Sequence, residues 1–277
     1  MSLTPQTTRI RSDMTAPRAP LLLTSPRLSA LGVPHGFSTR IGGVSSGIFT
    51  SLNLGNPSEL PADRRDPPAN IRANFGLILE SMACGDRQLV EVHQVHSAGV
   101  HTARAGAPPH PGDRDTKADA IVTDDPRRVL AVRVADCTPV LLSSADGRIV
   151  AAIHAGWRGV VSGVLPNTIG VMRDMDARGL VAAIGPCIGP DHFEVGEEVA
   201  AEFSRVFGDS AGLIRRTPGR KPHIDLKAAL ALQLRNAGIT AVDISDACTY
   251  RDHDRFFSHR RDQGLTGRSA GLIGPRA

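Results

Sequence analysis

The chain has 277 residues, and its content of 41% hydrophobic and 22% charged residues is typical of a globular protein with one large or two small domains. No apolar run approaches the roughly 18–20 residues of a membrane-spanning helix, and no apolar leader opens the chain, so we expect no membrane partner and a cytoplasmic location. The net charge of +4 is spread along the chain without a Lys-rich run, so we expect no nucleic-acid partner.

The first half of the chain contains more predicted loop than regular structure. Residues 1–20 are rich in Thr, Pro, Arg and Ser, and we expect a flexible tail there, with the ordered part starting near Leu21. Residues 57–70 read as a loop that leads into a helix over 71–83. Residues 104–115 contain three prolines and read as a second long loop, of the kind that is often functional.

From residue 129 onward, the sequence predicts a mixture of strands and helices. Apolar runs predict buried strands over 129–134, 140–142 and 149–154, the last two joined by a turn at 145–148. Further elements are expected after them: a helix over 161–175, a strand over 181–184, helices over 197–207 and 226–237, and a strand over 239–244. This mixture without strict alternation predicts an α+β protein with mixed β-sheets.

The four cysteines are far apart, and no Cys-x-x-Cys pair occurs among Cys84, Cys137, Cys187 and Cys248. A chain of this length needs no disulfide to fold, so we expect reduced thiols, in agreement with a cytoplasmic location.

One candidate metal site consists of His96, Cys137 and His154. They are separated by 41 and 17 positions, and each lies near the end of an apolar stretch, where functional side chains are often mounted. Catalytic zinc sites use three such ligands and keep a fourth position open. A lone buried cysteine and two ordinary histidines are the simpler interpretation of the spacing alone, and His93 competes with His96 for the first ligand position.

A Gly-rich segment over 35–55 offers a candidate anion site. Arg40 stands beside Gly42 and Gly43, so a guanidinium and backbone amides could together bind a phosphate. The alternative is a tight hairpin, which the composition alone favours.

A basic cluster near the C-terminus contains Arg260, Arg261 and Arg268. It could bind phosphate or a carboxylate, but a salt-bridged surface is the more common role of such a cluster. For the same reason His253 and His259 are expected to be ordinary surface histidines.

Linked motifs in a fixed order make the chain similar to a known family, the laccase-domain or multicopper polyphenol oxidase-like proteins, now regarded as purine nucleoside phosphorylases. The resemblance runs from about His35 to the C-terminus. The motifs lie at 35–45 (His-Gly-Phe-Ser-Thr-Arg-Ile-Gly-Gly-Val-Ser), 51–55, 94–96 (Gln-Val-His), 118–120 (Ala-Asp-Ala), 135–140 (Ala-Asp-Cys-Thr-Pro-Val), 154–159 (His-Ala-Gly-Trp-Arg-Gly), 184–189, 193–196, 248–250, 256–262 and 266–268.

The resemblance implies that His96, Cys137 and His154 are the metal ligands, because the family's first histidine follows Gln-Val, which selects His96 over His93. It implies one domain over 21–277, built as a four-layer α/β/β/α sandwich. It also implies phosphorolysis of adenosine, inosine, guanosine and S-methyl-5′-thioadenosine to the free base and the 1-phosphate of ribose or methylthioribose. Deamination of adenosine is implied as a second activity.

The family's two names imply different metals. One His-Cys-His set suits zinc and could also hold copper. A multicopper oxidase needs several coppers and clustered His-x-His motifs, which the sequence lacks. We therefore expect zinc as the cofactor and rank a copper-dependent polyphenol oxidase as the alternative.

Phosphorolysis requires a cationic site for inorganic phosphate. We expect Arg40 to form it, with Ser45 and Ser46 as weaker contributors and Arg158 as the second guanidinium. The expected partners are thus purine nucleosides and phosphate, bound by a monomer or weak homodimer.

The proton shuttle of the deamination has no assigned residue, although Asp136 and Glu194 are candidates. Asp136 adjoins a ligand and could instead orient it. Two rival functions are a hydrolase with Cys137 as nucleophile and His154 as base, and a metal-binding module without catalysis.

Overall fold

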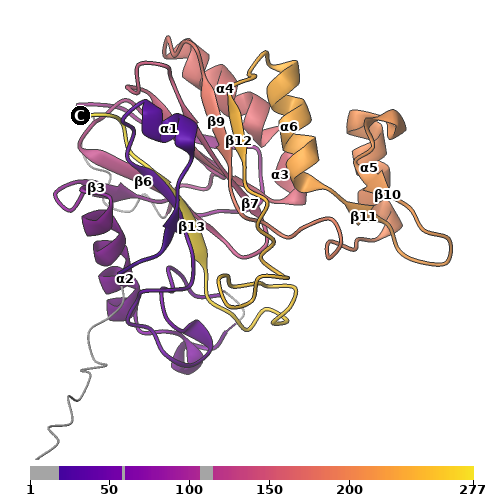
Figure 1. Ribbon diagram of the computed structural model, residues 1–277, viewed down its shortest axis with the longest axis horizontal. Coiled ribbons are helices and arrows are strands. Elements are labelled where there is room, and N and C mark those ends of the chain that lie inside the picture. The colour runs from indigo at the N-terminus through magenta and orange to yellow at the C-terminus, as the bar shows by residue number, and fades with distance from the viewer. Residues whose placement is uncertain (1–18, 58–59, 107–114) are drawn as a thin grey trace, which may run out of the picture.

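A computed structural model describes residues 19–57, 60–106 and 115–277. Two β-sheets pack face to face, and helices cover the outer face of each (Figure 1). The expected tail falls almost wholly, and the 104–115 loop mostly, outside the described residues. No helix in the described part is both long and apolar enough to cross a membrane.

The first sheet has five strands in the order β1-β2-β13-β6-β3. It is mixed, because β3 runs parallel to β6 while the other pairs are antiparallel. The strands are β1 (Leu22–Leu23), β2 (His35–Ser38), β3 (Gln88–Val90), β6 (Arg128–Val134) and β13 (Ser269–Ile273).

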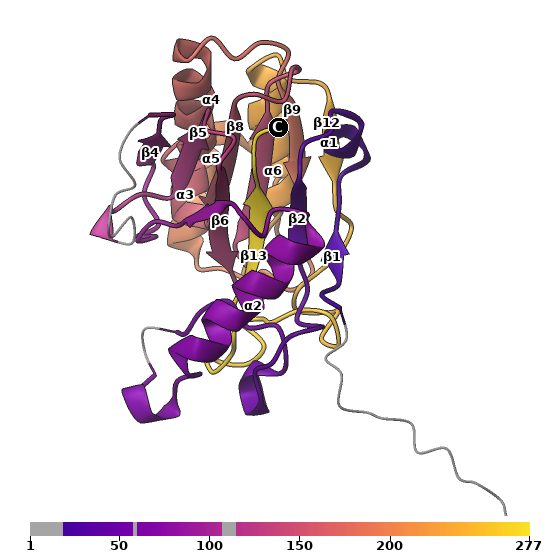
Figure 2. The same ribbon diagram turned by 90° about the vertical axis from the view of Figure 1, so that its left-hand side faces the viewer.

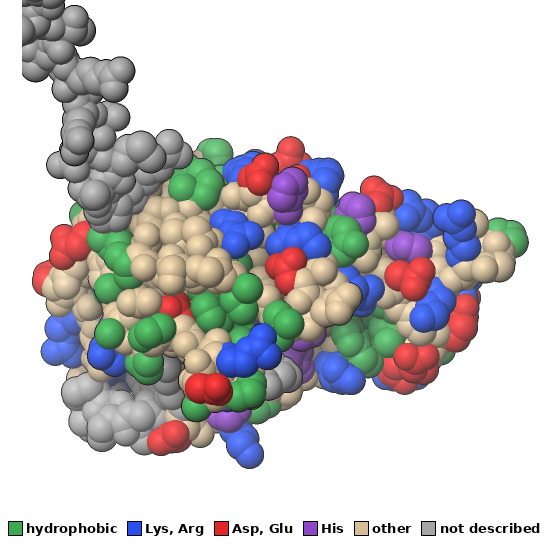
Figure 3. Space-filling view, turned by 90° about the horizontal axis from the view of Figure 1, so that it is seen from below, with side chains coloured by type: hydrophobic (Ala, Val, Ile, Leu, Met, Phe, Trp, Pro, Cys, Tyr) green, Lys and Arg blue, Asp and Glu red, His purple; other side chains and the backbone are tan. Residues whose placement is uncertain are grey.

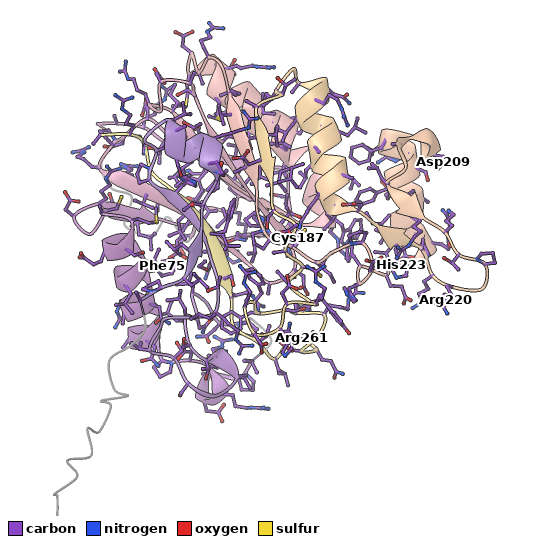
Figure 4. The ribbon with its side chains drawn as sticks, viewed as in Figure 1. Phe75, Cys187, Asp209, Arg220, His223 and Arg261 are labelled. Atoms are coloured by element: carbon purple, nitrogen blue, oxygen red, sulfur yellow. The ribbon has the colours of Figure 1, made fainter. Side chains whose placement is uncertain are left out.

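Helix α2 (Pro68–Ser81) covers the outer face of this sheet, as Figure 2 shows. Its Phe75 and Ile78 pack with Val129 of β6 and Leu272 of β13 in one apolar cluster. Phe75 is labelled on this helix in Figure 4. The helix begins three residues before the expected start, because Pro68 occupies the first helical turn, where its missing N–H is no loss.

The second sheet has six strands in the order β12-β9-β7-β8-β5-β4. It is also mixed, with β12–β9 and β4–β5 parallel. Its strands are β4 (Val100–Ala103), β5 (Ala120–Thr123), β7 (Thr138–Ser143), β8 (Val150–Ala155), β9 (Val181–Ile184) and β12 (Val242–Ile244).

Helices α3 (Trp157–Val161), α4 (Val164–Asp174) and α6 (Leu226–Asn236) cover the outer face of the six-stranded sheet. Their apolar side chains form one cluster with those of the sheet, for example Ile169 and Leu230 with Val140 and Ile153. A second cluster between the sheets joins Leu130 and Val132 to Leu141 and others. These layers confirm the α/β/β/α sandwich.

The helix expected over 161–175 is observed as α4, which starts three residues later, and the short helix α3 before it was not predicted. Ser162 and Gly163 separate the two helices, and Gly163, with a φ of 84°, precedes the first residue of α4. A left-handed residue cannot continue an α-helix, and glycine adopts this conformation at low cost. Helix α3 itself starts directly after β8, as part of the site described below.

A smaller projection lies beyond the second sheet, at the right of Figure 1. It consists of α5 (Glu197–Phe207) and a hairpin of β10 (Ile214–Arg215) and β11 (His223–Ile224). Asp209, Arg220 and His223 mark it in Figure 4. The remaining helix, α1 (Pro26–Ala30), has Ser25 as N-cap, and the Ser25 hydroxyl donates to Asp243 of β12.

Candidate metal and nucleoside site

Several loops meet at one end of both sheets. Strand register places them there: Val134, at the end of β6, pairs with Ser269, at the start of β13, and Ala155, at the end of β8, pairs with Thr138, at the start of β7. Figure 3 views the molecule from this end, where Lys, Arg and His side chains lie beside hydrophobic ones. The candidate site is built here, from loops rather than from the faces of the sheets.

The three expected ligands lie together. The ligand atoms of His96, Cys137 and His154 are all within 4.8 Å of one another, and the Cys137 Sγ lies 3.8 Å from the His96 Nε2. Tetrahedral zinc with its usual bond lengths to sulfur and nitrogen sets such atoms about 3.5 Å apart. The donor set therefore fits zinc in its chemistry, and its atoms converge on one point at separations slightly above this value. His93 is not part of this cluster, although it lies nearby.

Gly156 leaves room for the cluster. A Cβ at this position would lie 2.9 Å from the His96 Cδ2 and 3.0 Å from the Cys137 Sγ. Gly156 is also the N-cap of α3. Glycine is thus required here by the close approach of two ligands and not by backbone conformation, since its φ is −73°.

Asp119 fixes two of the three candidate ligands, although the sequence alone predicts no role for it. Its carboxylate is fully buried and accepts hydrogen bonds from the His154 Nδ1 at 2.8 Å, the His96 backbone N–H at 2.9 Å and the Ser97 hydroxyl at 2.8 Å. The bond to Nδ1 leaves the His154 Nε2 for the metal, as in carboxylate–histidine–zinc arrangements. The one signal in the sequence is a charged residue between two alanines at the start of an apolar run.

Asp119, Cys137 and His154 each stabilise the charged form of a neighbour in the cluster. Burial alone would raise the pKa of Asp119, but hydrogen bonds from His154 and Ser97 lower it to about 2. Burial opposes a charge on Cys137, yet the two histidines lower the pKa of its thiol to about 6. Burial opposes a charge on His154 too, while Cys137 and Asp119 raise its pKa to about 9. The cluster therefore favours a thiolate, the form that binds metal.

Two adjoining cavities open beside the cluster. The first, of about 140 Å³, has an apolar wall of Trp157, Ile188, Phe193 and Leu226. The second, of about 640 Å³, is bordered by cationic and polar side chains, which include Arg133, Arg158, Arg268, His93 and Asn56. Both cavities share a boundary of His96, Ala135, Cys137, Arg158 and His259. Hence an apolar and a cationic compartment meet at the candidate metal ligands.

Asp136 connects the ligand Cys137 to the C-terminal segment. Its φ is 81°, and its carboxylate accepts hydrogen bonds from the Thr249 hydroxyl at 2.6 Å, the Ser258 hydroxyl at 3.0 Å and the Arg260 backbone N–H at 2.7 Å. With three donors on its two oxygens, the carboxylate holds the loop before β7 against the segments that contain Thr249 and Ser258.

Glu194, the other candidate for the proton shuttle, is exposed, and its carboxylate lies 3.9 Å from the Lys221 ammonium. Its backbone carbonyl accepts from the Arg260 guanidinium.

The structure does not bring Arg40 to the cluster. The Arg40 guanidinium donates to the Thr50 carbonyl and stacks on the Phe257 ring, in a cavity that shares no lining residue with the two described above. The Gly42 and Gly43 amides donate to the Ser51 hydroxyl.

The two serines expected to help Arg40 differ in exposure. Ser45 is buried and donates to Asp66, whereas Ser46 is exposed and precedes the 3₁₀ turn Gly47–Phe49 without capping it.

Arg261 of the C-terminal basic cluster and the nearby His259 have different surroundings. Arg261, labelled in Figure 4, donates to the carbonyls of Thr249 and Phe256 and pairs with Asp262, so it is structural as expected. His259, expected to be an ordinary surface residue, is exposed but borders both cavities. The sequence could not show this, because 105 positions separate it from His154.

All four cysteines are free thiols in the described structure, as expected. Only Cys137 belongs to the cluster. Cys187, labelled at the centre of the molecule in Figure 4, is fully buried, and burial raises the pKa of its thiol to about 12. It therefore acts as a small apolar residue.

Comparison with known proteins gives matches over most of the chain. A family model described as multi-copper polyphenol oxidoreductase laccase matches residues 34–276. A protein of Deinococcus radiodurans named purine nucleoside phosphorylase is 37% identical over 263 residues, which cover 94% of this chain and 95% of that protein. Purine nucleoside phosphorylase YfiH of Escherichia coli is 38% identical and covers 87% of this chain and 93% of its own.

Solved structures show the same fold. A Neisseria meningitidis protein aligns with a TM-score of 0.79 and 35% identity, covering 94% of this chain and all of the other. YlmD of Geobacillus stearothermophilus aligns with a TM-score of 0.82 and 30% identity, covering 94% and 97%.

Proposed function

Because this chain belongs to the family described as multi-copper polyphenol oxidoreductase laccases, with relatives named purine nucleoside phosphorylases, we propose that it is a zinc-dependent purine nucleoside phosphorylase. Its proposed substrates are inorganic phosphate and adenosine, inosine, guanosine or S-methyl-5′-thioadenosine. The products are the free purine and the 1-phosphate of the sugar.

The observation that carries this proposal is the meeting of an apolar and a cationic cavity at the cluster. A purine is flat and apolar on its faces, and it fits a compartment walled by Trp157 and Phe193. Phosphate is a dianion, and it fits the compartment that contains Arg158. A nucleoside with its base in the first cavity would place its ribose at the shared boundary.

Different residues of the site would orient the reactants and hold the metal. Arg158 stacks its guanidinium on the Trp157 ring at 4.5 Å, so one residue pair borders both compartments and can orient base and phosphate together. Holding both reactants in line lowers the entropic part of the barrier to such a displacement. His96, Cys137 and His154 would hold zinc, which would supply a Lewis acid at the boundary of the two cavities.

The site favours this function over a multicopper oxidase. Among the described residues, His96, Cys137 and His154 form the only group of three or more His, Cys, Asp or Glu side chains that could hold a metal ion. One copper ion cannot store the four electrons that the reduction of dioxygen to water requires. Oxidase chemistry of the kind in the family's description therefore has no support from the donor groups.

Inosine and phosphate provide the test. The purified enzyme should release hypoxanthine and ribose 1-phosphate in equal amounts, and neither without phosphate. Arg158→Gln should raise the KM for phosphate by about 10- to 150-fold, the equivalent of a charge-assisted contact of roughly 1.5–3 kcal/mol.

Arg40→Gln is the matched arm, because Arg40 was expected from the sequence to bind phosphate but lines another cavity. It should leave the KM for phosphate unchanged. If Arg40→Gln raised the KM for phosphate and Arg158→Gln left it unchanged, the phosphate site would instead lie at the Gly-rich loop.

We also propose deamination of adenosine as a second activity of the site. His96, Cys137 and His154 would hold zinc, which would supply activation of water, the reactant that deamination needs. Adenosine without phosphate should then yield inosine, whereas adenosine with phosphate should yield adenine as well. The absence of inosine under both conditions would contradict the deaminase activity.

A further inference from the structure

His259 occupies the boundary between the two cavities. It borders both the apolar and the cationic compartment, together with the metal ligands His96 and Cys137. No hydrogen bond or ion pair of its imidazole is found among the described residues, whereas the neighbouring arginines are bonded to the protein: Arg260 to Glu194 and Arg261 to Asp262. The ring is therefore available to a ligand at the point where the bond between base and sugar would lie.

The backbone around His259 is held in place. Ser258 and Arg260, its two neighbours, both donate to the carboxylate of Asp136, and the His259 carbonyl accepts from the Gly264 N–H. Asp136 itself precedes the ligand Cys137. The segment that carries the imidazole is thus fixed to the same loop as the sulfur ligand, although the ring is exposed to the cavities.

Phosphorolysis needs a proton at this place. When the bond between C1′ and N9 breaks, its electron pair stays on the purine, and a neutral base can leave only if a proton reaches the ring. We propose that His259 is the general acid that protonates the departing purine. This inference rests on the proposed function and assigns to it a catalytic residue.

Other side chains around the apolar cavity do not suit this role. The carboxylate of Asp136 already accepts three hydrogen bonds. Arg158 and Arg260 do not release protons at neutral pH. His96 and Cys137 belong to the proposed metal site. Among the titratable groups lining this cavity, this leaves His259.

The step balances with one proton. An oxygen of the phosphate dianion forms a bond to C1′ as the C1′–N9 bond breaks, and the electron pair of that bond moves into the purine. The proton of the His259 imidazolium goes to a purine nitrogen, which gives neutral hypoxanthine from inosine. The sugar phosphate forms as a monoanion, and its loss of a proton restores the imidazolium.

Two substrates separate acid catalysis from any other role. Inosine needs a proton on its base, whereas 7-methylguanosine already carries a positive charge on the purine and leaves without one. His259→Gln should lower kcat with inosine by about 100-fold or more, the usual contribution of a general acid. The same variant should lose less than threefold with 7-methylguanosine. His253→Gln, which changes a histidine outside both cavities, is the control.

The outcomes are distinct. Equal losses with both substrates, or no loss with either, would overturn the role of His259 while leaving the proposed function intact. Turnover of 7-methylguanosine by the variant also shows that it is folded. If the wild-type enzyme forms no ribose 1-phosphate from either nucleoside, the proposed function fails, and the role of His259 fails with it.

Discussion

Asp119 shows how one residue can determine the geometry of a site that it does not itself line. Its carboxylate holds the His154 ring through Nδ1 and holds the His96 loop through backbone N–H groups. His96 has a φ of 59°, a conformation that non-glycine residues seldom adopt. The hydrogen bonds of Asp119 compensate for the cost of this turn and present both imidazoles to one point.

Asp119→Asn tests this role, because asparagine has nearly the same shape but lacks the charge. Metal affinity should fall by about 10- to 100-fold, as is usual when the partner of a ligating histidine is changed. Competition with a chromogenic zinc chelator measures the affinity. Asp124→Asn, which changes an acidic residue that caps a loop at Ala105, should leave it unchanged. Equal affinities for wild type and Asp119→Asn would show that Asp119 serves only the fold.

Cys137→Ala tests the ligand set itself. The variant should lose zinc and both proposed activities, because a two-histidine remainder binds zinc weakly. His93→Ala should keep zinc near one per chain, since His93 lies outside the cluster. Elemental analysis of both purified variants decides between them. Full zinc content in Cys137→Ala would exclude Cys137 as a ligand.

The elements follow the sequence where periodicity and end signals agree. The strand over 181–184 and the helix over 197–207 are confirmed with their bounds, because apolar runs end at clear turn residues. By contrast, β2 and β13 were not predicted. Each carries a glycine that resembles a turn signal, but Gly36 lies against Leu22 of the neighbouring strand, and Gly271 lies against Pro139 of the facing sheet. The need for glycine at these positions depends on neighbours distant in sequence, so the local sequence does not reveal it.

The site was likewise predictable from the sequence only in part. The His-Cys-His set followed from motifs, and the structure brings it together. The roles of Asp119, Asp136 and His259 depend on which loops meet at one end of two sheets. Strand order decides that, and one sequence does not reveal strand order.

The break between α3 and α4 gives a prediction at the scale of the element. Gly163→Ala should lower the free energy of unfolding by about 1 kcal/mol, because alanine is strained at a positive φ. Gly170→Ala is the matched control, since it also adds a methyl group in open space but lies inside α4. It should raise stability by about 0.5–1 kcal/mol. Urea unfolding measures both. Opposite signs are expected, and a loss in both variants would contradict the conformational reason.

At the scale of the whole molecule, the metal would join distant parts of the chain. His96 follows β3 of the five-stranded sheet, Cys137 links that sheet to the other, and His154 lies in β8 of the six-stranded sheet. A ligand that binds only the folded state stabilises it, by about 2.7 kcal/mol at a concentration 100 times its Kd.

Chelation should therefore lower the melting temperature of the wild type by roughly 5–10 °C, given about 2–4 °C per kcal/mol for a chain of this size. Cys137→Ala should melt at one temperature with or without chelator. Differential scanning calorimetry measures both. If the melting temperature of the wild type stayed the same after verified loss of zinc, the ion would make no contribution to the stability of the fold.

Trp157 has a further use because the chain contains one tryptophan and one tyrosine. Its indole forms part of the wall of the apolar cavity, beneath the Arg158 guanidinium. All tryptophan emission of the protein therefore originates at the proposed purine compartment. A nucleoside that stacks there will quench or shift this emission, so its occupancy can be followed optically in the unlabelled enzyme, with phosphate withheld to prevent phosphorolysis.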